Sequence, residues 1–160
     1  MRYHLAQINI GRFRLPFEDP ANADFVAALD AVNALAEAQP GFVWRLVGEG
    51  NNATDLRPFD DPQMLINMSV WTDLEALAGF VYRMPGHREI MRRRREWFEP
   101  MDVYMALWWV PAGHIPSIAE GTERLDLLRR LGPTRDAFLF VRPFAPPGEA
   151  PATPILDECA

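Results

Sequence analysis

The sequence predicts an α+β fold with a ferredoxin-like β-α-β-β-α-β core, followed by an added C-terminal helix and strand. The prediction depends on two kinds of periodicity, since some segments alternate every second residue and others repeat at helical spacing. It also depends on proline, glycine and capping residues that separate these segments. The segment order matches the split β-α-β arrangement, and a length of 160 residues fits one domain with one core.

Strands are predicted where apolar residues alternate or form short runs bounded by turn residues. They are residues 3–10, 42–47, 65–71, 103–110 and 137–141. Helices are predicted where apolar residues recur at helical spacing after a capping residue and before proline or glycine. They begin near Asp19, Asp73 and Ser117, and the second is interrupted near Pro85 before it continues to about Phe98.

The domain organisation follows from where these patterns stop. Residues 1–142 are predicted to form the folded domain. Residues 143–160 are rich in proline and alanine with little to bury, which predicts a mobile tail. Residues 48–62 are rich in glycine, asparagine, proline and aspartate, which predicts a long loop of a kind that is often functional.

The composition argues against several classes of function. A net charge of −6 disfavours a general nucleic-acid-binding protein, because phosphate neutralisation needs a basic surface. The only cysteine, Cys159, permits no intrachain disulfide and no thiolate zinc site. No histidine pair or carboxylate cluster has metal-site spacing, so no metal is predicted, and no cofactor is assigned. Without a signal peptide or an apolar run of roughly 20 residues, the protein is expected to be cytoplasmic and without a membrane partner.

The predicted sheet is apolar on both faces. In the second strand Phe42, Trp44 and Leu46 lie on one face, and Val43 and Val47 lie on the other. Helices on one face would leave the second face bare, and an uncovered apolar face needs a partner. Homodimerisation, sheet against sheet, is therefore predicted.

The helix after Pro85 contains the clearest candidates for a ligand site. At about 100° per residue, one arc of roughly 120° collects both apolar and polar side chains. They are His87, Ile90, Met91, Arg94, Trp97 and Phe98. A guanidinium keeps its charge when buried and then needs an anionic or carbonyl partner. Arg94 is therefore predicted to hold an anionic ligand group; an internal salt bridge, or a stem packed in the core, is the alternative.

His87 is predicted to share that pocket. It follows a helix start, where the helix dipole favours the neutral imidazole. Neutral imidazole can act as a base or bind a metal, which makes His87 and Arg94 the candidate catalytic pair. The alternative is a histidine whose ring is hydrogen-bonded to a backbone carbonyl.

Four further residues are predicted to bind the ligand: Met91, Trp97, Trp108 and Asn67. Met91 and Trp97 share the helix arc, and Trp97 and Trp108 are expected to wall the pocket. Trp108 and Trp109 are adjacent on a strand, so one should face the helix-side core or pocket and the other the dimer interface. Asn67 shares a strand face with Ser69, and these polar groups either form a network across the dimer interface or orient a substrate.

Several strings resemble a domain-of-unknown-function family in the dimeric α/β-barrel superfamily. They are AQINIGR (6–12), PGFVWRL (40–46), MRRRREWF (91–98) and LWWVPAGH (107–114). The resemblance covers roughly residues 3–140 and implies a dimeric barrel with a pocket between helices and sheet. The superfamily includes cofactor-independent monooxygenases of the antibiotic-biosynthesis type, and haem proteins such as chlorite dismutases and dye-decolourising peroxidases.

These observations leave three functions open. The first is a cofactor-independent, monooxygenase-like enzyme acting on an oxidisable ring compound, with His87 as base and Arg94 stabilising an oxyanion. The second is a haem protein with His87 as the axial ligand and Arg94 near a propionate. The third is a non-catalytic dimeric protein that binds a small molecule.

Overall fold

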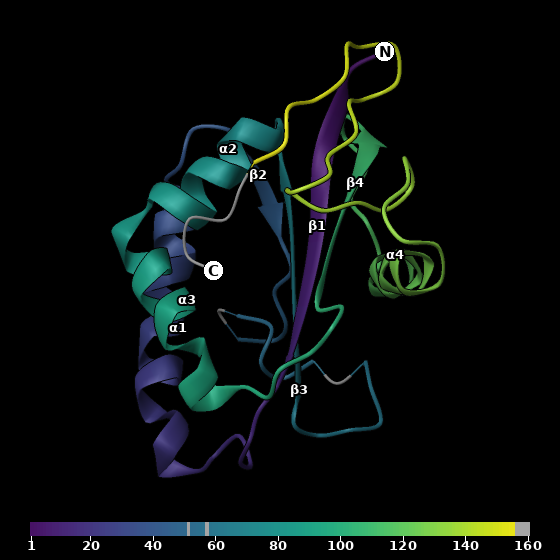
Figure 1. Cartoon of the computed structure of the whole chain (residues 1–160). Coiled ribbons are helices and arrows are strands. Elements are labelled where there is room, and N and C mark those ends of the chain that lie inside the picture. The colour runs from purple at the N-terminus through teal and green to yellow at the C-terminus, as the bar shows by residue number, and fades with distance from the viewer. Residues whose placement is uncertain (51, 57, 156–160) are drawn as a thin grey trace.

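The computed structural model describes residues 1–50, 52–56 and 58–155, and it confirms the ferredoxin-like α+β fold (Figure 1). The strands are β1 (Tyr3–Arg12), β2 (Phe42–Arg45), β3 (Met64–Trp71) and β4 (Met105–Pro111). The helices are α1 (Ala23–Glu37), α2 (Leu74–Ala78), α3 (Pro85–Trp97) and α4 (Ile118–Leu131). A 3-10 helix, η1 (Pro20–Asn22), precedes α1, and a π-helix, η2 (Gly79–Arg83), joins α2 to α3.

The strands form one antiparallel sheet in the order β2-β3-β1-β4. The central strand β1 pairs along its length with both neighbours. Gln7 lies opposite Ser69 and Leu107, and Asn9 lies opposite Asn67 and Met105. Because side chains alternate along a strand, these residues share one face of the sheet.

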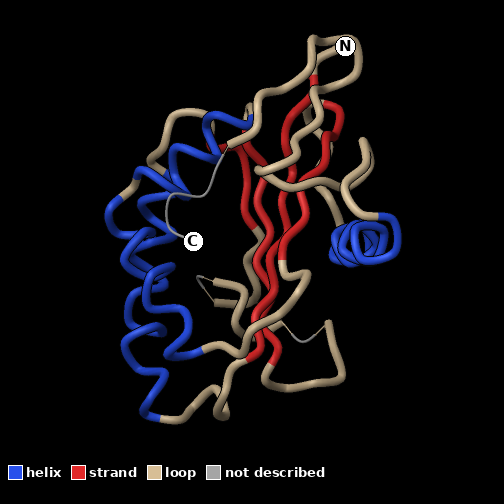
Figure 2. Tube along the Cα trace, viewed as in Figure 1, coloured by secondary structure: helices blue, strands red, loops and turns tan. Residues whose placement is uncertain are grey.

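Helices cover the two faces unequally (Figure 2). The layer of α1, α2 and α3 covers the face that carries Gln7 and Asn9, and α4 lies on the opposite face. No helix in the described ranges is long and apolar enough to cross a bilayer.

Three of the helix starts are capped as their sequences predict. The Asp19 carboxylate accepts a hydrogen bond from the Ala21 backbone N–H at 2.9 Å, ahead of η1. Asp73 accepts from the Ala76 N–H at 2.8 Å, and Ser117 accepts from the Glu120 N–H at 3.1 Å. Each cap satisfies a backbone donor that the helix itself leaves unpaired.

The face expected to be bare is covered by the chain itself, so the apolar-face argument for a dimer is wrong. Leu125 and Leu128 of α4 pack against a buried cluster on this face that includes Ile8, Met68 and Trp108. Part of the long loop after β2 packs there as well, through Leu56, Phe59 and other partly buried residues. Within the described residues, no side chain of 46–63 lines the pocket on the opposite face. Homodimerisation stays a prediction.

The C-terminal region also differs from expectation. Residues 137–141 form no strand; Phe138 makes a single antiparallel bridge with Leu107 of β4, and a second bridge joins Leu139 to Arg142. Beyond the expected boundary at 142, Phe144 accepts a hydrogen bond from the Trp109 indole at 2.7 Å. The described part of the expected tail therefore packs on the core at this point, and its mobility stays a prediction. Cys159 lies outside the described residues.

Gly121 sets how closely α4 approaches the sheet. A Cβ at this position would lie 2.9 Å from both Ile8 Cδ1 and Met68 Cε. We expect Gly121→Val to lower the free energy of unfolding by about 1–3 kcal/mol, the usual cost of overpacking a core. Ala119→Val, on the exposed side of the same helix, is the control. Urea unfolding measures both, and equal midpoints would contradict this packing.

Candidate functional site

A cavity of about 340 Å³ lies between the sheet and the layer of α1 and α3. Its walls are mostly apolar and include Leu29, Leu65, Phe80 and Ile90. Its floor is the polar face of β1 and β3, where four polar side chains come together. They are Gln7, Asn9, Asn67 and Ser69.

A hydrogen-bonded network holds this floor in one arrangement. The Gln7 amide nitrogen donates to Asn67 Oδ1 and to Ser69 Oγ, both at 2.8 Å. The Asn9 amide nitrogen donates to Gln7 Oε1 at 3.0 Å and to Asn67 Oδ1 at 3.3 Å. The Trp71 indole donates to Ser69 Oγ at 2.9 Å. The network lies in the cavity, which favours the interpretation that these residues orient a substrate, and the dimer-interface interpretation stays a prediction.

Some polar groups of the floor stay available to a ligand. An amide nitrogen has two N–H donors and a hydroxyl has one O–H. Both Gln7 donors and both Asn9 donors are used, whereas the Asn67 Nδ2 and the Ser69 hydroxyl donate to no other described residue. The floor therefore offers donors from β3, at Asn67 and Ser69.

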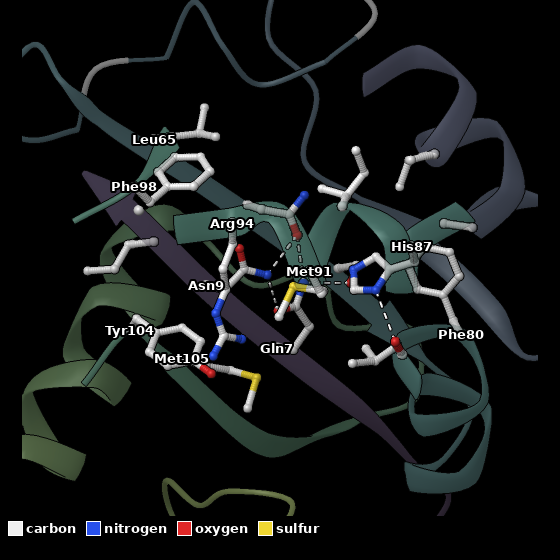
Figure 3. A pocket seen from close by; sticks show the side chains of 18 of the residues that line it. Gln7, Asn9, Leu65, Phe80, His87, Met91, Arg94, Phe98, Tyr104 and Met105 are labelled. Atoms are coloured by element: carbon white, nitrogen blue, oxygen red, sulfur yellow. Dashed lines mark hydrogen bonds between the residues drawn. The ribbon is translucent and has the colours of Figure 1, made fainter. Parts of the chain in front are cut away.

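His87 lies at the α3 side of the cavity and is held by a backbone carbonyl. Its Nδ1 lies 3.1 Å from the Val81 oxygen. A carbonyl only accepts, so Nδ1 carries the proton, and in the neutral ring Nε2 is a free acceptor. Burial lowers the pKa of His87, more than the hydrogen bond to Val81 raises it. Figure 3 shows the second ring nitrogen on the side toward Met91.

Pro85 explains why the Val81 carbonyl is available. In a continuous α-helix this carbonyl would accept from the N–H of residue 85, four positions later. Proline has no N–H, and Pro85 is the first residue of α3 after the π-helix η2. His87, in the next turn, takes the position of the missing donor.

Arg94 supplies the pocket with a cation. Its guanidinium carbon lies 5.7 Å from the centre of the Tyr104 ring, an arrangement that favours a cation. No carboxylate within the described residues lies at salt-bridge distance from it. The other arginines near this pocket differ, because buried Arg45 pairs with Glu37 at 2.6 Å and the Arg95 side chain is exposed. The internal salt bridge considered for Arg94 is absent from the described part of the chain.

The structure brings four of the six selected residues to one cavity. These are His87, Arg94, Met91 and Asn67. Trp97 and Trp108 lie elsewhere, which corrects their expected place in the pocket wall. Trp97 is at the C-terminal end of α3 and packs with Phe25, and the Trp108 indole donates to Glu120 under α4 at 2.9 Å.

Two aromatic residues that the sequence did not single out also shape the site. Phe80 lies between His87 and Trp71, with its ring tilted against the imidazole at 4.7 Å and stacked on the indole at 5.4 Å between ring centres. It belongs to the π-helix, so α-helical spacing does not predict the direction of its side chain. Tyr104 lies beside Arg94 but precedes β4 in an apolar run, which carries no signal of a site.

The lowered pKa of His87 makes stability depend on pH. In the unfolded chain this histidine takes up a proton near pH 6.5, whereas in the fold it does so only at lower pH. As the pH falls, the unfolded state thus binds more protons than the folded state. The stability that the neutral ring contributes is therefore fully present above pH 6.5 and is lost as the pH falls below it. We expect His87→Gln to flatten the decline in unfolding free energy from pH 7 to 5, by at most about 1.4 kcal/mol per pH unit. Equal slopes for the two proteins would contradict the buried neutral ring.

We expect Pro85→Ala to shift the proton of His87 toward Nε2. Proline holds Met84 in its extended conformation. Without it Met84 can return to helical dihedrals, and the new N–H at residue 85 then competes for the Val81 carbonyl, which now fixes the proton on Nδ1. Nitrogen-15 correlation spectra of the imidazole report the tautomer directly. Pro62→Ala, in the exposed loop before β3, is the control. An unchanged tautomer in Pro85→Ala would show that proline is not the reason why the Val81 carbonyl is available to His87.

The described residues contain no group of three or more histidine, cysteine, aspartate or glutamate side chains arranged to hold a metal ion. Among curated proteins, none matches the chain. A family model described as "Domain of unknown function (DUF3291)" matches residues 4–153.

Similar solved structures have low sequence identity. SnoaB, a cofactor-independent oxygenase from Streptomyces nogalater, is 20% identical over 70% of this chain and 95% of that chain, with a TM-score of 0.46. A conserved protein from Methanosarcina mazei Go1 is 12% identical over 67% and 90%, with a TM-score of 0.47. A protein of unknown function from Nitrosomonas europaea is 15% identical over 72% and 96%, with a TM-score of 0.45. Because the family model spans nearly the whole chain, the protein belongs to the family "Domain of unknown function (DUF3291)".

Proposed function

We propose that this protein binds a small oxidisable ring compound in the cavity and acts on it as a cofactor-independent, monooxygenase-like enzyme. The observation that carries the proposal is a neutral, carbonyl-anchored His87. It shares one apolar cavity with amide and hydroxyl donors and with Arg94, which has no carboxylate partner among the described residues. The sequence resemblance described above suggests the reaction class, and the pocket suggests which residues perform it.

His87 is the proposed base. Its Nδ1–H is engaged by Val81, so its Nε2 is the atom that would take a proton from the substrate. Contact with the tilted ring of Phe80, at 4.7 Å between ring centres, restricts how the imidazole can turn. A base held in one tautomer and one orientation needs little reorganisation when it accepts a proton.

The anion formed by deprotonation is the species to be stabilised. The Asn67 amide and the Ser69 hydroxyl are donors fixed by the network on the floor, and fixed donors stabilise developing charge most in a site with little water. Arg94 does not contact the reacting atoms, but its positive charge elsewhere in the same cavity favours the anion at longer range. Loss of the proton from an enol or phenol hydroxyl of the substrate leaves negative charge on a ring carbon, which would then react with dioxygen. That carbon, a CH₂ in the keto form, becomes C=O, one oxygen atom enters the product and the other leaves in water.

Haem binding is the second candidate, because neutral His87 presents a nitrogen that could ligate iron. The His87 nitrogen is a suitable ligand for haem iron, but the cavity is too small for the haem. A cavity of about 340 Å³ is at the low end of the roughly 300–1,000 Å³ range of pockets for drug-sized ligands, and a haem macrocycle is larger than such ligands. No step is assigned to haem on this ground.

The test uses anthrone, a tricyclic ketone with one activated CH₂, as the substrate. Oxygen uptake and the absorbance of the quinone product measure its turnover. We expect wild-type protein to accelerate oxidation, and His87→Ala to lower kcat about 10²–10⁴-fold, the usual contribution of a general base. Activity should rise with pH through the lowered pKa of His87 and be flat at neutral pH.

His114→Ala is the matched control, since this histidine lies outside the cavity and pairs with Glu120 at 2.7 Å. Binding of ring compounds without any oxygen uptake would leave the non-catalytic binding protein as the function. A sharp Soret band after addition of hemin, lost in His87→Ala, would instead establish the haem protein and refute the enzyme proposed here.

A further inference from the structure

The cavity has two chemically different ends. His87 and Arg94 are seven residues apart on α3, which separates them by about 10 Å along the helix axis at 1.5 Å per residue. Figure 3 shows His87 beside Phe80, and Arg94 beside Asn9 and Tyr104. Met91 lies between them on the same side of the helix. One small functional group of a ligand therefore cannot contact both residues.

The strands give the same separation independently. The His87 end lies near Trp71, because Phe80 contacts both rings. The Arg94 end is tied to the opposite part of the floor, because Tyr104 directly precedes Met105, which pairs with Asn9. Asn9 lies opposite Asn67, four residues before Trp71 on β3, a span of about 13 Å at roughly 3.3 Å per residue.

Each end selects a different chemical group. At the first end, Nε2 of His87 is an acceptor, so the matching ligand group is a donor such as a hydroxyl. At the second end, the Arg94 guanidinium has only donors and a full charge, so the matching group is an anion. One guanidinium balances a carboxylate, whereas a phosphate monoester brings about −1.5 to −2 charges. Arg45, which also lines the cavity, is already paired with Glu37.

The part between the ends selects an apolar body. Met91 and Ile90 line it from α3, and Leu29 and Val32 line it from α1. The sheet side offers neutral amide and hydroxyl groups, and its charged lining residue, Arg45, is paired with Glu37. A ligand that crosses from end to end thus buries hydrocarbon along its length and polar groups at its tips.

We propose that the ligand is an elongated hydroxy acid, with its carboxylate on Arg94, its apolar body along Met91 and its hydroxyl at His87. This deepens the proposed function, on which the hydroxyl contact with His87 rests. The carboxylate contact stands on Arg94 alone. Arg94 is thereby a residue that determines specificity at a distance from the reacting atoms.

The experiment uses 6-hydroxy-2-naphthoic acid and its neutral amide, 6-hydroxy-2-naphthamide, titrated calorimetrically into the full-length protein at pH 7.5. We expect the acid to bind about tenfold to a hundredfold more tightly than the amide, the range for one charge-assisted hydrogen bond. Arg94→Gln should remove this preference and leave the Kd of the amide nearly unchanged. Equal affinities for acid and amide, or no saturable binding of the acid, would overturn the proposal.

Arg92→Gln is the matched control, because this exposed arginine on the same helix pairs with Glu89 and does not line the cavity. It should keep the full preference for the acid; if it loses the preference as Arg94→Gln does, the effect is general surface charge and the proposal fails. Arg94→Lys retains the charge without the planar fork and should keep part of the preference. Thermal unfolding of each variant shows that the fold is intact.

The length of the ligand is tested with 4-hydroxybenzoic acid, which is too short to reach both ends. His87→Gln should weaken binding of 6-hydroxy-2-naphthoic acid and leave that of 4-hydroxybenzoic acid unchanged. If both acids respond equally to His87→Gln, the two-ended arrangement is wrong. If the wild-type protein prefers the acid but does not turn over anthrone, only the proposed enzyme activity is refuted. If it turns over anthrone but does not prefer the acid, only the proposed hydroxy-acid ligand is refuted.

Discussion

Side chains along β1 alternate between an apolar environment and a polar one, and the rest of the structure depends on this alternation. Ala6 and Ile8 are fully buried under α4, whereas Gln7 and Asn9 face α1 and α3. A shift of one residue in the pairing of β1 would exchange the two environments. It would place two amides in the densest part of the core and empty the floor of the cavity. The register of the central strand therefore determines the position of the site.

Amides on the floor of the cavity do not stabilise the fold as apolar residues would. A hydrogen bond between side chains contributes about 1 kcal/mol net, whereas a polar group left without a partner in the interior costs about 1–3 kcal/mol. The network satisfies every donor of Gln7 and Asn9, whereas the donors of Asn67 and Ser69, on the side of the cavity, have no partner within the part of the chain that the structure describes. An arrangement that only served stability would not need to direct these groups into a pocket, and this is why we propose that they contact a ligand.

Periodicity predicted much of the site because helical spacing fixes direction. The arc on α3 placed His87, Met91 and Arg94 together, and the structure confirms that they line one cavity. Strand alternation separates Trp108 from Trp109 but does not say which face holds the pocket, so Trp108 was assigned to the wrong side. Trp97 shares the arc yet lies a full turn beyond Arg94, where Phe25 of α1 covers it. The path of α4 across the sheet depends on contacts far apart in the sequence, such as Gly121 against Met68, which no local pattern records.

The interruption near Pro85 was visible in the sequence as a break in a helix, and the structure gives it a chemical consequence. A helix that ran unbroken from α2 into α3 would use the Val81 carbonyl internally and would leave the buried ring of His87 to find another partner. The π-helix and the proline together release that carbonyl at the place where the ring arrives. The break removes backbone hydrogen bonds of the helix. Part of that loss is offset because the Val81 carbonyl accepts a hydrogen bond from Nδ1 of a partly buried histidine. The break in the helix thus fixes which nitrogen of His87 is free, which is the property that a base in this cavity requires.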